Sequence, residues 1–139
     1  MNKSILITGC STGIGYVCAH ALHKQGFHVI ASCRKLDDVQ RLQSEGLTCI
    51  QLDLDDPISI TSGAKQAIEL AQGQLYALFN NGAYGQPGAL EDLPTEALKA
   101  QFQTNFLVGT NWFKRYYPLC VLKVKDALFK TAPSWVLPQ

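Results

Sequence analysis

Apolar and polar positions follow two alternating patterns along the first 106 residues of the chain. Short apolar runs, typical of strands buried on both faces, are separated by stretches in which apolar residues recur at helical spacing. The runs cover residues 4–8, 27–32, 47–52 and 75–79, and the helical stretches are 14–25, 37–44, one opened by Asp56 and Pro57, and one capped by Thr95. This βαβαβαβα order predicts an α/β fold with a doubly wound parallel sheet, right-handed crossovers and helices on both faces, truncated after about four strands.

Three glycines mark the expected ends of the first three helices. Gly26, Gly46 and Gly73 each follow a helical stretch, where a residue that tolerates a positive φ is favoured. In the fourth helix the spacing predicts that Leu98, Phe102 and Phe106 point inward.

Composition narrows the class of protein further. The 139 residues suit one domain, and a formal net charge of +1 with scattered charged residues indicates neither a nucleic-acid partner nor an acidic tail. The five cysteines are odd in number and lack C-x-x-C spacing, which favours a reducing compartment, and we expect a cytoplasmic protein. No uncharged apolar stretch reaches membrane-spanning length, so we expect no membrane partner.

A glycine-rich loop follows the first apolar run. Residues 8–15 read T-G-C-S-T-G-I-G, between a predicted strand and a predicted helix. A dinucleotide pyrophosphate needs a tight turn, bare backbone near the phosphates and a small residue where helix meets sheet, and Gly9, Gly13 and Gly15 can supply these in turn. The alternative interpretation is an ordinary glycine turn.

The T-G-x-x-x-G-x-G spacing resembles the classical short-chain dehydrogenase/reductase family rather than other Rossmann proteins. The resemblance runs from Lys3 to about Phe106 and implies a Rossmann-like fold, with residues 1–106 as its NADP(H)-binding part. It implies one catalytic residue, Asn105, and a set of cofactor-binding residues: Thr8, Gly9, Ser11, Gly13, Ile14, Gly15, Arg34, Asp53, Asn80 and Gly82.

Four of these residues lie in three shorter family-like motifs. Asp53, in Q-L-D-L, matches the family aspartate that meets the adenine, and its alternative role is that of a plain capping carboxylate. The N-N-G-A at 80–83 resembles the family's N-N-A-G with the last two residues exchanged. Asn105, in T-N-F, matches the asparagine that helps to hold a water linked to the catalytic lysine; otherwise it is a polar residue inside a helix.

The choice of cofactor rests on the end of the second predicted strand. NAD enzymes place a carboxylate there for the ribose 2′-hydroxyl, whereas this chain reads A-S-C-R-K. The guanidinium of Arg34 can fork onto a 2′-phosphate, and Ser11 can donate to it as well, so we predict NADP(H). The alternative for Arg34 is a solvated loop cation.

Two other clusters suggest metal binding only weakly. His20 and His23 are three apart on a helix without a carboxylate or thiol at matching spacing, which favours a solvated helix face. Asp53, Asp55 and Asp56 fit strand-end and helix-start roles better than a cation site.

The sequence after Phe106 does not continue the family pattern. The family's catalytic serine and Y-x-x-x-K motif are missing, and Ser134 lies in T-A-P-S-W. One choice of codons for residues 126–139, shifted by one base, reads G-R-I-V-Q-N-S-S-V-L-G-F-A-A, which resembles the family's fifth strand with its serine. We therefore expect residues 107–139 to be an out-of-frame tail that follows a one-base loss near Phe106. The alternative is a genuine short protein with its own tail.

These observations lead to one functional hypothesis with alternatives. We expect a truncated NADP(H)-dependent short-chain oxidoreductase, inactive as it stands, whose intact form transfers hydride between NADP(H) and a small-molecule alcohol or carbonyl. Family members often pair subunits through the helix that starts here at Thr95, so the resemblance implies that the intact form can be a homo-oligomer. The alternatives are a nucleotide-binding or interaction module without chemistry, and a chain without function.

Overall fold

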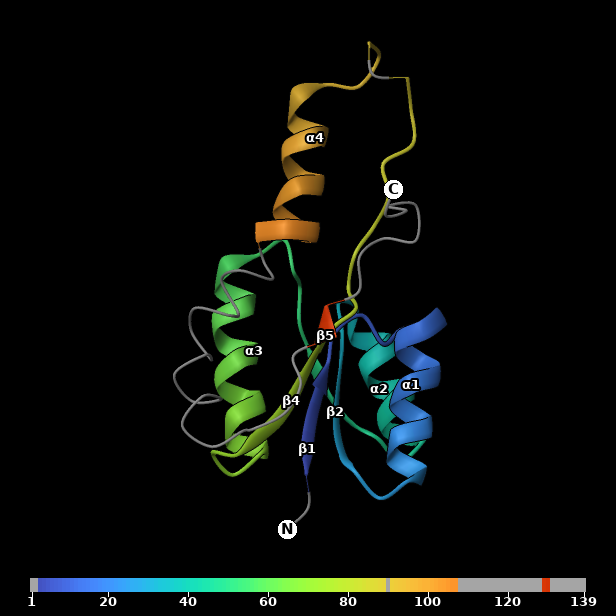
Figure 1. The fold of residues 1–139 in the computed structure, drawn as a ribbon, viewed down its shortest axis with the longest axis vertical. Helices are drawn as coiled ribbons and strands as arrows, with labels where there is room; N and C mark the ends of the chain where they lie inside the picture. Colours follow the sequence, from blue (N-terminus) through green and yellow to red (C-terminus); the bar gives the residue numbers. More distant parts are fainter. Residues whose placement is uncertain (1–2, 90, 108–128, 131–139) are drawn as a thin grey trace.

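The computed structural model describes residues 3–89, 91–107 and 129–130, which form a parallel sheet flanked by helices (Figure 1). The strands are β1 (Ser4–Ile7), β2 (His28–Cys33), β3 (Thr48–Gln51), β4 (Leu75–Asn80) and β5 (Phe129–Lys130). The helices are α1 (Gly13–Lys24), α2 (Leu36–Ser44), α3 (Pro57–Leu70) and α4 (Thr95–Phe102), followed by a π-helical turn, η1 (Gln103–Leu107).

The sheet has the order β3-β2-β1-β4-β5, and all its strand pairs are parallel. Ile5 lies opposite Val29 on one side and Ala77 on the other, so β1 is a central strand. The predicted fold class is confirmed. The four expected strands are present, and β5 adds a two-residue strand in which Phe129 pairs with Phe79. The carboxyl ends of β1 and β4 lie side by side, where the strand order reverses, and open α/β sheets bind ligands at such a point.

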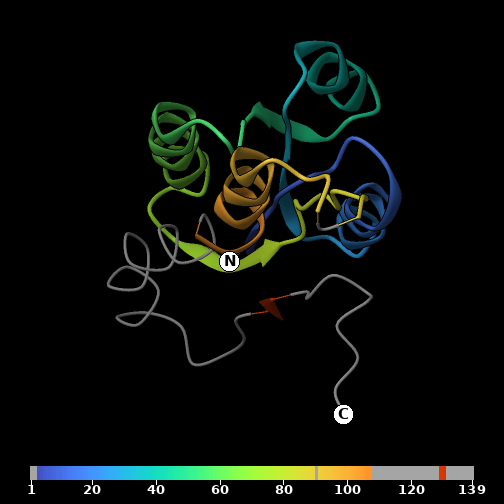
Figure 2. The same cartoon turned by 90° about the horizontal axis from the view of Figure 1, so that it is seen from above.

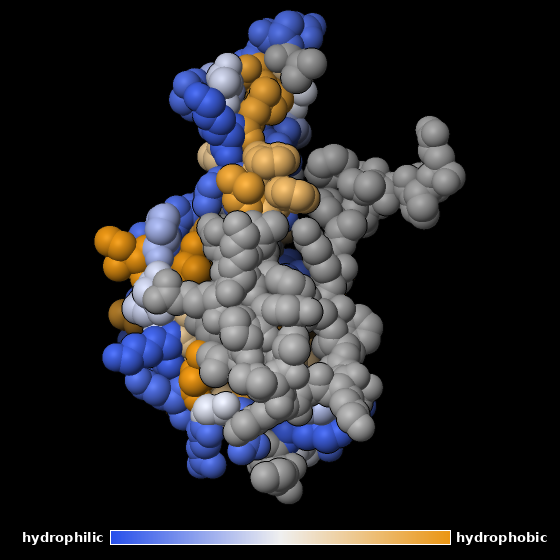
Figure 3. All heavy atoms as spheres, turned by 60° about the vertical axis from the view of Figure 1, so that its left-hand side comes forward, coloured by the Kyte–Doolittle hydropathy of each residue, from blue (hydrophilic) through white to orange (hydrophobic). Residues whose placement is uncertain are grey.

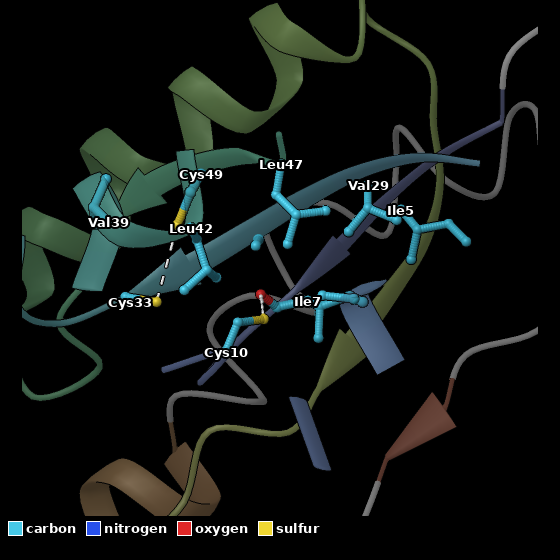
Figure 4. Packing of buried hydrophobic residues seen from close by; sticks show 11 residues of the cluster. Ile5, Ile7, Cys10, Val29, Cys33, Val39, Leu42, Leu47 and Cys49 are labelled. Atoms are coloured by element: carbon cyan, nitrogen blue, oxygen red, sulfur yellow. Dashed lines mark hydrogen bonds between the residues drawn. The ribbon is translucent and has the colours of Figure 1, made fainter. Parts of the chain in front are cut away.

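Two apolar clusters, one on each face of the sheet, form the core. Helix α3 covers one face of the sheet, and α1 and α2 cover the other (Figure 2). Side chains alternate along β1, so Leu6 joins the cluster beneath α3, and Ile5 and Ile7 join the one beneath α1 and α2. Figure 4 shows the second cluster, in which the Cys49 and Cys33 sulfurs lie 3.9 Å apart. Burial raises the pKa of the Cys10 thiol to about 12, so this thiol stays neutral and unreactive.

The ends of the first three helices follow the local sequence. Asp56 caps α3, because its carboxylate accepts a hydrogen bond of 2.9 Å from the backbone N–H of Ile58. Gly26, Gly46 and Gly73 follow the three helices with φ values of 86°, 90° and 73°, as predicted.

The fourth helix differs from its prediction. Thr95 does not cap α4, because Pro94 occupies the N-cap position and offers no side-chain acceptor. Leu98, Phe102 and Phe106 are 38%, 55% and 47% exposed, so the prediction that they point inward is wrong. α4 extends beyond the carboxyl ends of the strands, where no residue of the helix is buried, and its apolar side chains lie on the surface (Figures 1 and 3).

The proposed out-of-frame tail falls mostly outside the described residues. Of 107–139, the structure describes Leu107 and the two residues of β5. Tyr116, Tyr117 and Ser134 lie outside them.

Candidate nucleotide-binding site

The glycine loop between β1 and α1 needs glycine for two separate reasons. Gly9 and Gly13 have φ values of 70° and 64°, a backbone conformation that is strained for residues with a side chain. Space is the second reason. A Cβ on Gly9 would lie 2.7 Å from the Cα of Gly82, and one on Gly15 would overlap the carbonyl oxygen of Gly9 and lie 2.6 Å from Nδ2 of Asn81. Tight packing of the loop against itself and against the loop after β4 therefore excludes a side chain at Gly9 and Gly15.

The loop after β4 locks this glycine loop in place. The hydroxyl oxygen of Thr8 accepts hydrogen bonds from the backbone N–H groups of Asn81 (3.0 Å) and Gly82 (2.9 Å). In return, Nδ2 of Asn81 donates to the carbonyl oxygens of Thr8 (3.0 Å) and Gly9 (3.1 Å). The sequence prediction missed Asn81, although the second asparagine of N-N-G-A was a signal for it. Gly82 serves here as a backbone donor.

A pocket of about 220 Å³ opens beside the loop. Four predicted residues line it: Gly9, Ser11, Arg34 and Asp53. Six further residues that the prediction did not assign to the site complete the lining: Leu52, Leu54, Asp55, Ala83, Tyr84 and Thr104. The carboxyl ends of β1, β2 and β3 and the loop after β4 thus contribute to one site. Ala83, rather than Gly82, reaches the pocket.

One end of the pocket combines a cation with two carboxylates. The exposed Arg34 follows β2, and its carbonyl oxygen accepts a hydrogen bond of 3.1 Å from Nε2 of Gln51. After β3, Oδ1 of Asp53 accepts from the backbone N–H of Asp55 at 2.9 Å. Burial, followed by the charge of Asp53, raises the pKa of Asp55, and Arg34 opposes this shift. The positive charge of Arg34 therefore acts on the carboxylate of Asp55.

Another part of the pocket wall comes from η1. Oδ1 of Asn105 accepts from the backbone N–H of Tyr84 (3.0 Å), and its Nδ2 donates to the Tyr84 carbonyl (2.6 Å), which fixes the loop after β4. The neighbouring Thr104 is 7% exposed, and its hydroxyl has no hydrogen-bond partner among residues 3–89, 91–107 and 129–130. A buried hydroxyl without a partner is unfavourable, so this wall suits a polar ligand.

The remaining predicted residues lie outside the pocket lining. Ile14, the second residue of α1, is 67% exposed, and Asn80 ends β4, where it pairs with Lys130. Nε2 of His20 lies 2.8 Å from a carboxylate oxygen of Glu45. Within the described part of the chain, no three His, Cys, Asp or Glu side chains gather where they could hold a metal ion. Within the same part, no helix has both the length and the apolar character needed to span a bilayer.

The sequence profile described as "short chain dehydrogenase" matches residues 3–122. The chain belongs to the short-chain dehydrogenase family. The match continues past Phe106, the limit of the resemblance described above, so part of the segment after Phe106 also aligns with the family.

Relatives of this short-chain dehydrogenase occur in bacteria and fungi. An uncharacterised oxidoreductase of Escherichia coli, YbbO, is 47% identical over 118 residues, which cover 85% of this chain and 44% of that protein. The NADPH-dependent 1-acyldihydroxyacetone phosphate reductase of Schizosaccharomyces pombe is 32% identical over 105 residues, or 75% of this chain and 36% of that protein. The chain therefore spans less than half the length of both relatives.

Solved structures of the family share the fold. A short-chain dehydrogenase from Streptomyces avermitilis superposes with a TM-score of 0.79 at 25% identity, over 86% of this chain and 45% of that one. One from Burkholderia cenocepacia, solved in complex with NADP, gives a TM-score of 0.67 at 28% identity, over 81% of this chain and 50% of that one.

The residues of this short-chain dehydrogenase fit a dinucleotide. Gly13 is exposed at the start of α1, and the side chain of Thr12 makes no capping bond to the N-terminus of that helix. Phosphate groups bind favourably to such bare amides at the positive end of a helix dipole. The unpartnered hydroxyl of Thr104 and the cation of Arg34 lie on the same pocket.

Proposed function

We propose that this chain forms the NADP(H)-binding part of a short-chain oxidoreductase, residues 1–106, whose intact form transfers hydride between NADP(H) and a small-molecule alcohol or carbonyl. The observation that carries this proposal is the single pocket that joins Gly9 and Ser11 of the glycine loop to Arg34 and Asp53. Glycine-loop backbone favours a pyrophosphate, and a guanidinium at the end of β2 favours a 2′-phosphate.

Each part of the pocket then has a role in holding the cofactor. Backbone N–H groups of the glycine loop hold the pyrophosphate, Asp53 contacts the adenine, and Arg34 and Ser11 hold the 2′-phosphate. When bound, the nicotinamide supplies or accepts the hydride. The NADPH dependence named for the Schizosaccharomyces pombe relative and the NADP complex of the Burkholderia cenocepacia protein support this choice of cofactor.

Catalysis needs groups that this sequence does not supply. No Y-x-x-x-K motif occurs among the 139 residues, so we propose that the chain binds the nucleotide without turning over a substrate. Asn105 keeps its proposed role of holding a water for proton transfer in the intact enzyme, and its amide fixes Tyr84 beside the pocket. We further propose a cytoplasmic protein, because Cys10, Cys33 and Cys49 are buried free thiols.

Titration calorimetry of the full 139-residue chain with NADPH and NADH tests this proposal. Charge-assisted hydrogen bonds contribute about 1.5–3 kcal/mol, so Arg34→Ala should weaken NADPH about ten- to a hundredfold and leave NADH nearly unchanged. Lys65→Ala is the matched control, because Lys65 is an exposed cation on α3 outside the pocket lining. Equal losses for both nucleotides, or no NADPH binding by the unaltered chain, would refute the proposal.

A further inference from the structure

Arg41 of α2 ties the glycine loop to the helix that follows Arg34. Its Nη2 donates to the backbone carbonyl of Ser11 at 2.7 Å and to Oδ1 of Asp38 at 3.0 Å. Its Nη1 lies 3.4 Å from a carboxylate oxygen of Glu45, and its guanidinium lies 5.5 Å from the ring centre of Tyr16. One side chain thus joins the glycine loop to both α1 and α2.

The contact to Ser11 holds the middle of the loop. Ser11 lies between Gly9 and Gly13, the two residues with positive φ, and such a segment has high conformational freedom. Cys10 is held by a backbone bond of 2.9 Å from its N–H to the Ser32 carbonyl. The next residue, Ser11, is held through its carbonyl by Arg41, 30 positions later in the chain. This contact therefore fixes the backbone of Ser11, a residue of the pocket lining.

The same guanidinium also forms an ion pair with the carboxylate of Asp38. Asp38 lies in the first turn of α2, four positions after Arg34, and its charge acts on Cys33, the residue before Arg34. An unpaired carboxylate near the end of β2 would repel a phosphate bound by Arg34. The ion pair with Arg41 offsets the charge of Asp38, so that Asp38 adds little to the repulsion from Asp53 and Asp55.

We propose that Arg41 is a positioning residue for recognition of the nucleotide 2′-phosphate: it fixes Ser11 in the glycine loop and neutralises Asp38 in the first turn of α2. The inference rests on the proposed function, since it concerns the same nucleotide site. A guanidinium suits the role because its planar fork can serve Ser11, Asp38 and Glu45 together, whereas a lysine offers a single point charge.

Two probes that differ only in the 2′-phosphate isolate this effect. The full chain is titrated with adenosine 2′,5′-bisphosphate and with adenosine 5′-monophosphate. Arg41→Gln removes the charge and keeps most of the aliphatic stem of the side chain. From the strength of charge-assisted hydrogen bonds, we expect the bisphosphate to bind about tenfold more weakly and the monophosphate to change by less than about threefold.

A second variant tests the part played by Asp38 and keeps the proposal testable if Arg41→Gln fails to fold. Asp38→Asn alone leaves Arg41 on Ser11, so it should bind the bisphosphate as well as the unaltered chain or better. The double variant with Asp38→Asn and Arg41→Gln should bind the bisphosphate at least about threefold more tightly than Arg41→Gln alone, because the unpaired carboxylate is gone. A tenfold loss in Asp38→Asn alone would overturn the proposal, as would the lack of any recovery in the double variant.

The titrations separate a failure of the proposed NADP(H) site from a failure of the proposed role of Arg41. If the unaltered chain does not prefer the bisphosphate, the proposed NADP(H) site fails and this inference fails with it. If the unaltered chain prefers the bisphosphate and Arg41→Gln keeps that preference, or weakens both probes equally, only the role of Arg41 fails.

Discussion

The side-chain amide of Asn81 donates a hydrogen bond of 3.1 Å to the carbonyl oxygen of Gly9, a residue 72 positions earlier. A second bond from the same nitrogen reaches the Thr8 carbonyl at 3.0 Å. The loop after β4 thus fixes the loop after β1 through hydrogen bonds from one side-chain amide. Because phosphate recognition needs backbone amides fixed in advance, this contact pre-organises the candidate site.

Replacing Asn81 by alanine should destabilise the chain. Two hydrogen bonds are lost and two partly buried carbonyls lose partners, so we expect a decrease of about 1–3 kcal/mol in the free energy of unfolding, measured by urea denaturation. Asn81→Asp should be worse, since it directs a carboxylate at two carbonyl oxygens. As a control, Gln66→Ala removes an exposed amide on α3 and should change stability by less than about 0.5 kcal/mol. A similar small change in Asn81→Ala would contradict the locking role.

The close approach of Gly15 to the glycine loop predicts a strong effect of one added methyl group. In Gly15→Ala the Cβ would overlap the Gly9 carbonyl and Nδ2 of Asn81, and both belong to the lock. We expect a loss of about 1–3 kcal/mol in stability, as in other overpacked sites, together with loss of nucleotide binding. Gly85→Ala is the matched control, because no other atom of the described residues lies within 4 Å of its Cβ position. Thermal melts with and without NADPH would measure both the stability and the nucleotide binding of the two variants. Equal melting temperatures and equal rises with NADPH would contradict the prediction.

The hydroxyl of Thr104 should behave differently in the free and the bound protein. Thr104→Val removes a buried hydroxyl that lacks a partner among the described residues, so the free chain should melt at the same or a higher temperature. If the hydroxyl meets a polar ligand in the pocket, the same variant should show a smaller rise in melting temperature with NADPH. A variant that is destabilised without ligand would show that the hydroxyl already has a partner.

The chain should bind the nucleotide but not oxidise it. Reduction of a carbonyl needs a positioned acid to protonate the developing oxygen, and the tyrosine and lysine of Y-x-x-x-K are missing from this sequence. NADPH absorbance measured with a panel of aldehydes and ketones should therefore fall no faster than without protein. NADPH oxidation that co-purifies with the protein would refute this expectation.

The strands and the glycine loop could be predicted because their signals are local. β1 and β2 are buried on both faces, so their apolar runs stand out, and the loop's glycines meet demands of conformation and space within a few residues. The helical spacing in α4 was also local, but it shows only that Leu98 and Phe102 share a face. It does not show what covers that face, and the prediction of burial failed there.

The parts that the sequence analysis missed depend on contacts between distant segments. Asn81 reaches Thr8 across 73 positions and Arg41 reaches Ser11 across 30, each through a side-chain bond to a backbone carbonyl. Any donor of suitable length can make such a bond, so neither residue leaves a pattern in its neighbourhood. The contact of Asn81 becomes visible only when the sheet order brings β4 next to β1, and that of Arg41 only when it brings β2, with α2 after it, to the other side of β1.

The sheet order also has a consequence for the chain during its synthesis. β1, β2 and β3 lie within the first 51 residues and can pair as soon as these emerge from the ribosome, whereas the strand that completes the site ends at Asn80. Until Asn81 has emerged, Thr8 and Gly9 lack the partners that hold the glycine loop. A growing chain should therefore gain its nucleotide affinity late and abruptly, so that cofactor capture reports the docking of β4 rather than the earlier collapse of the first three strands.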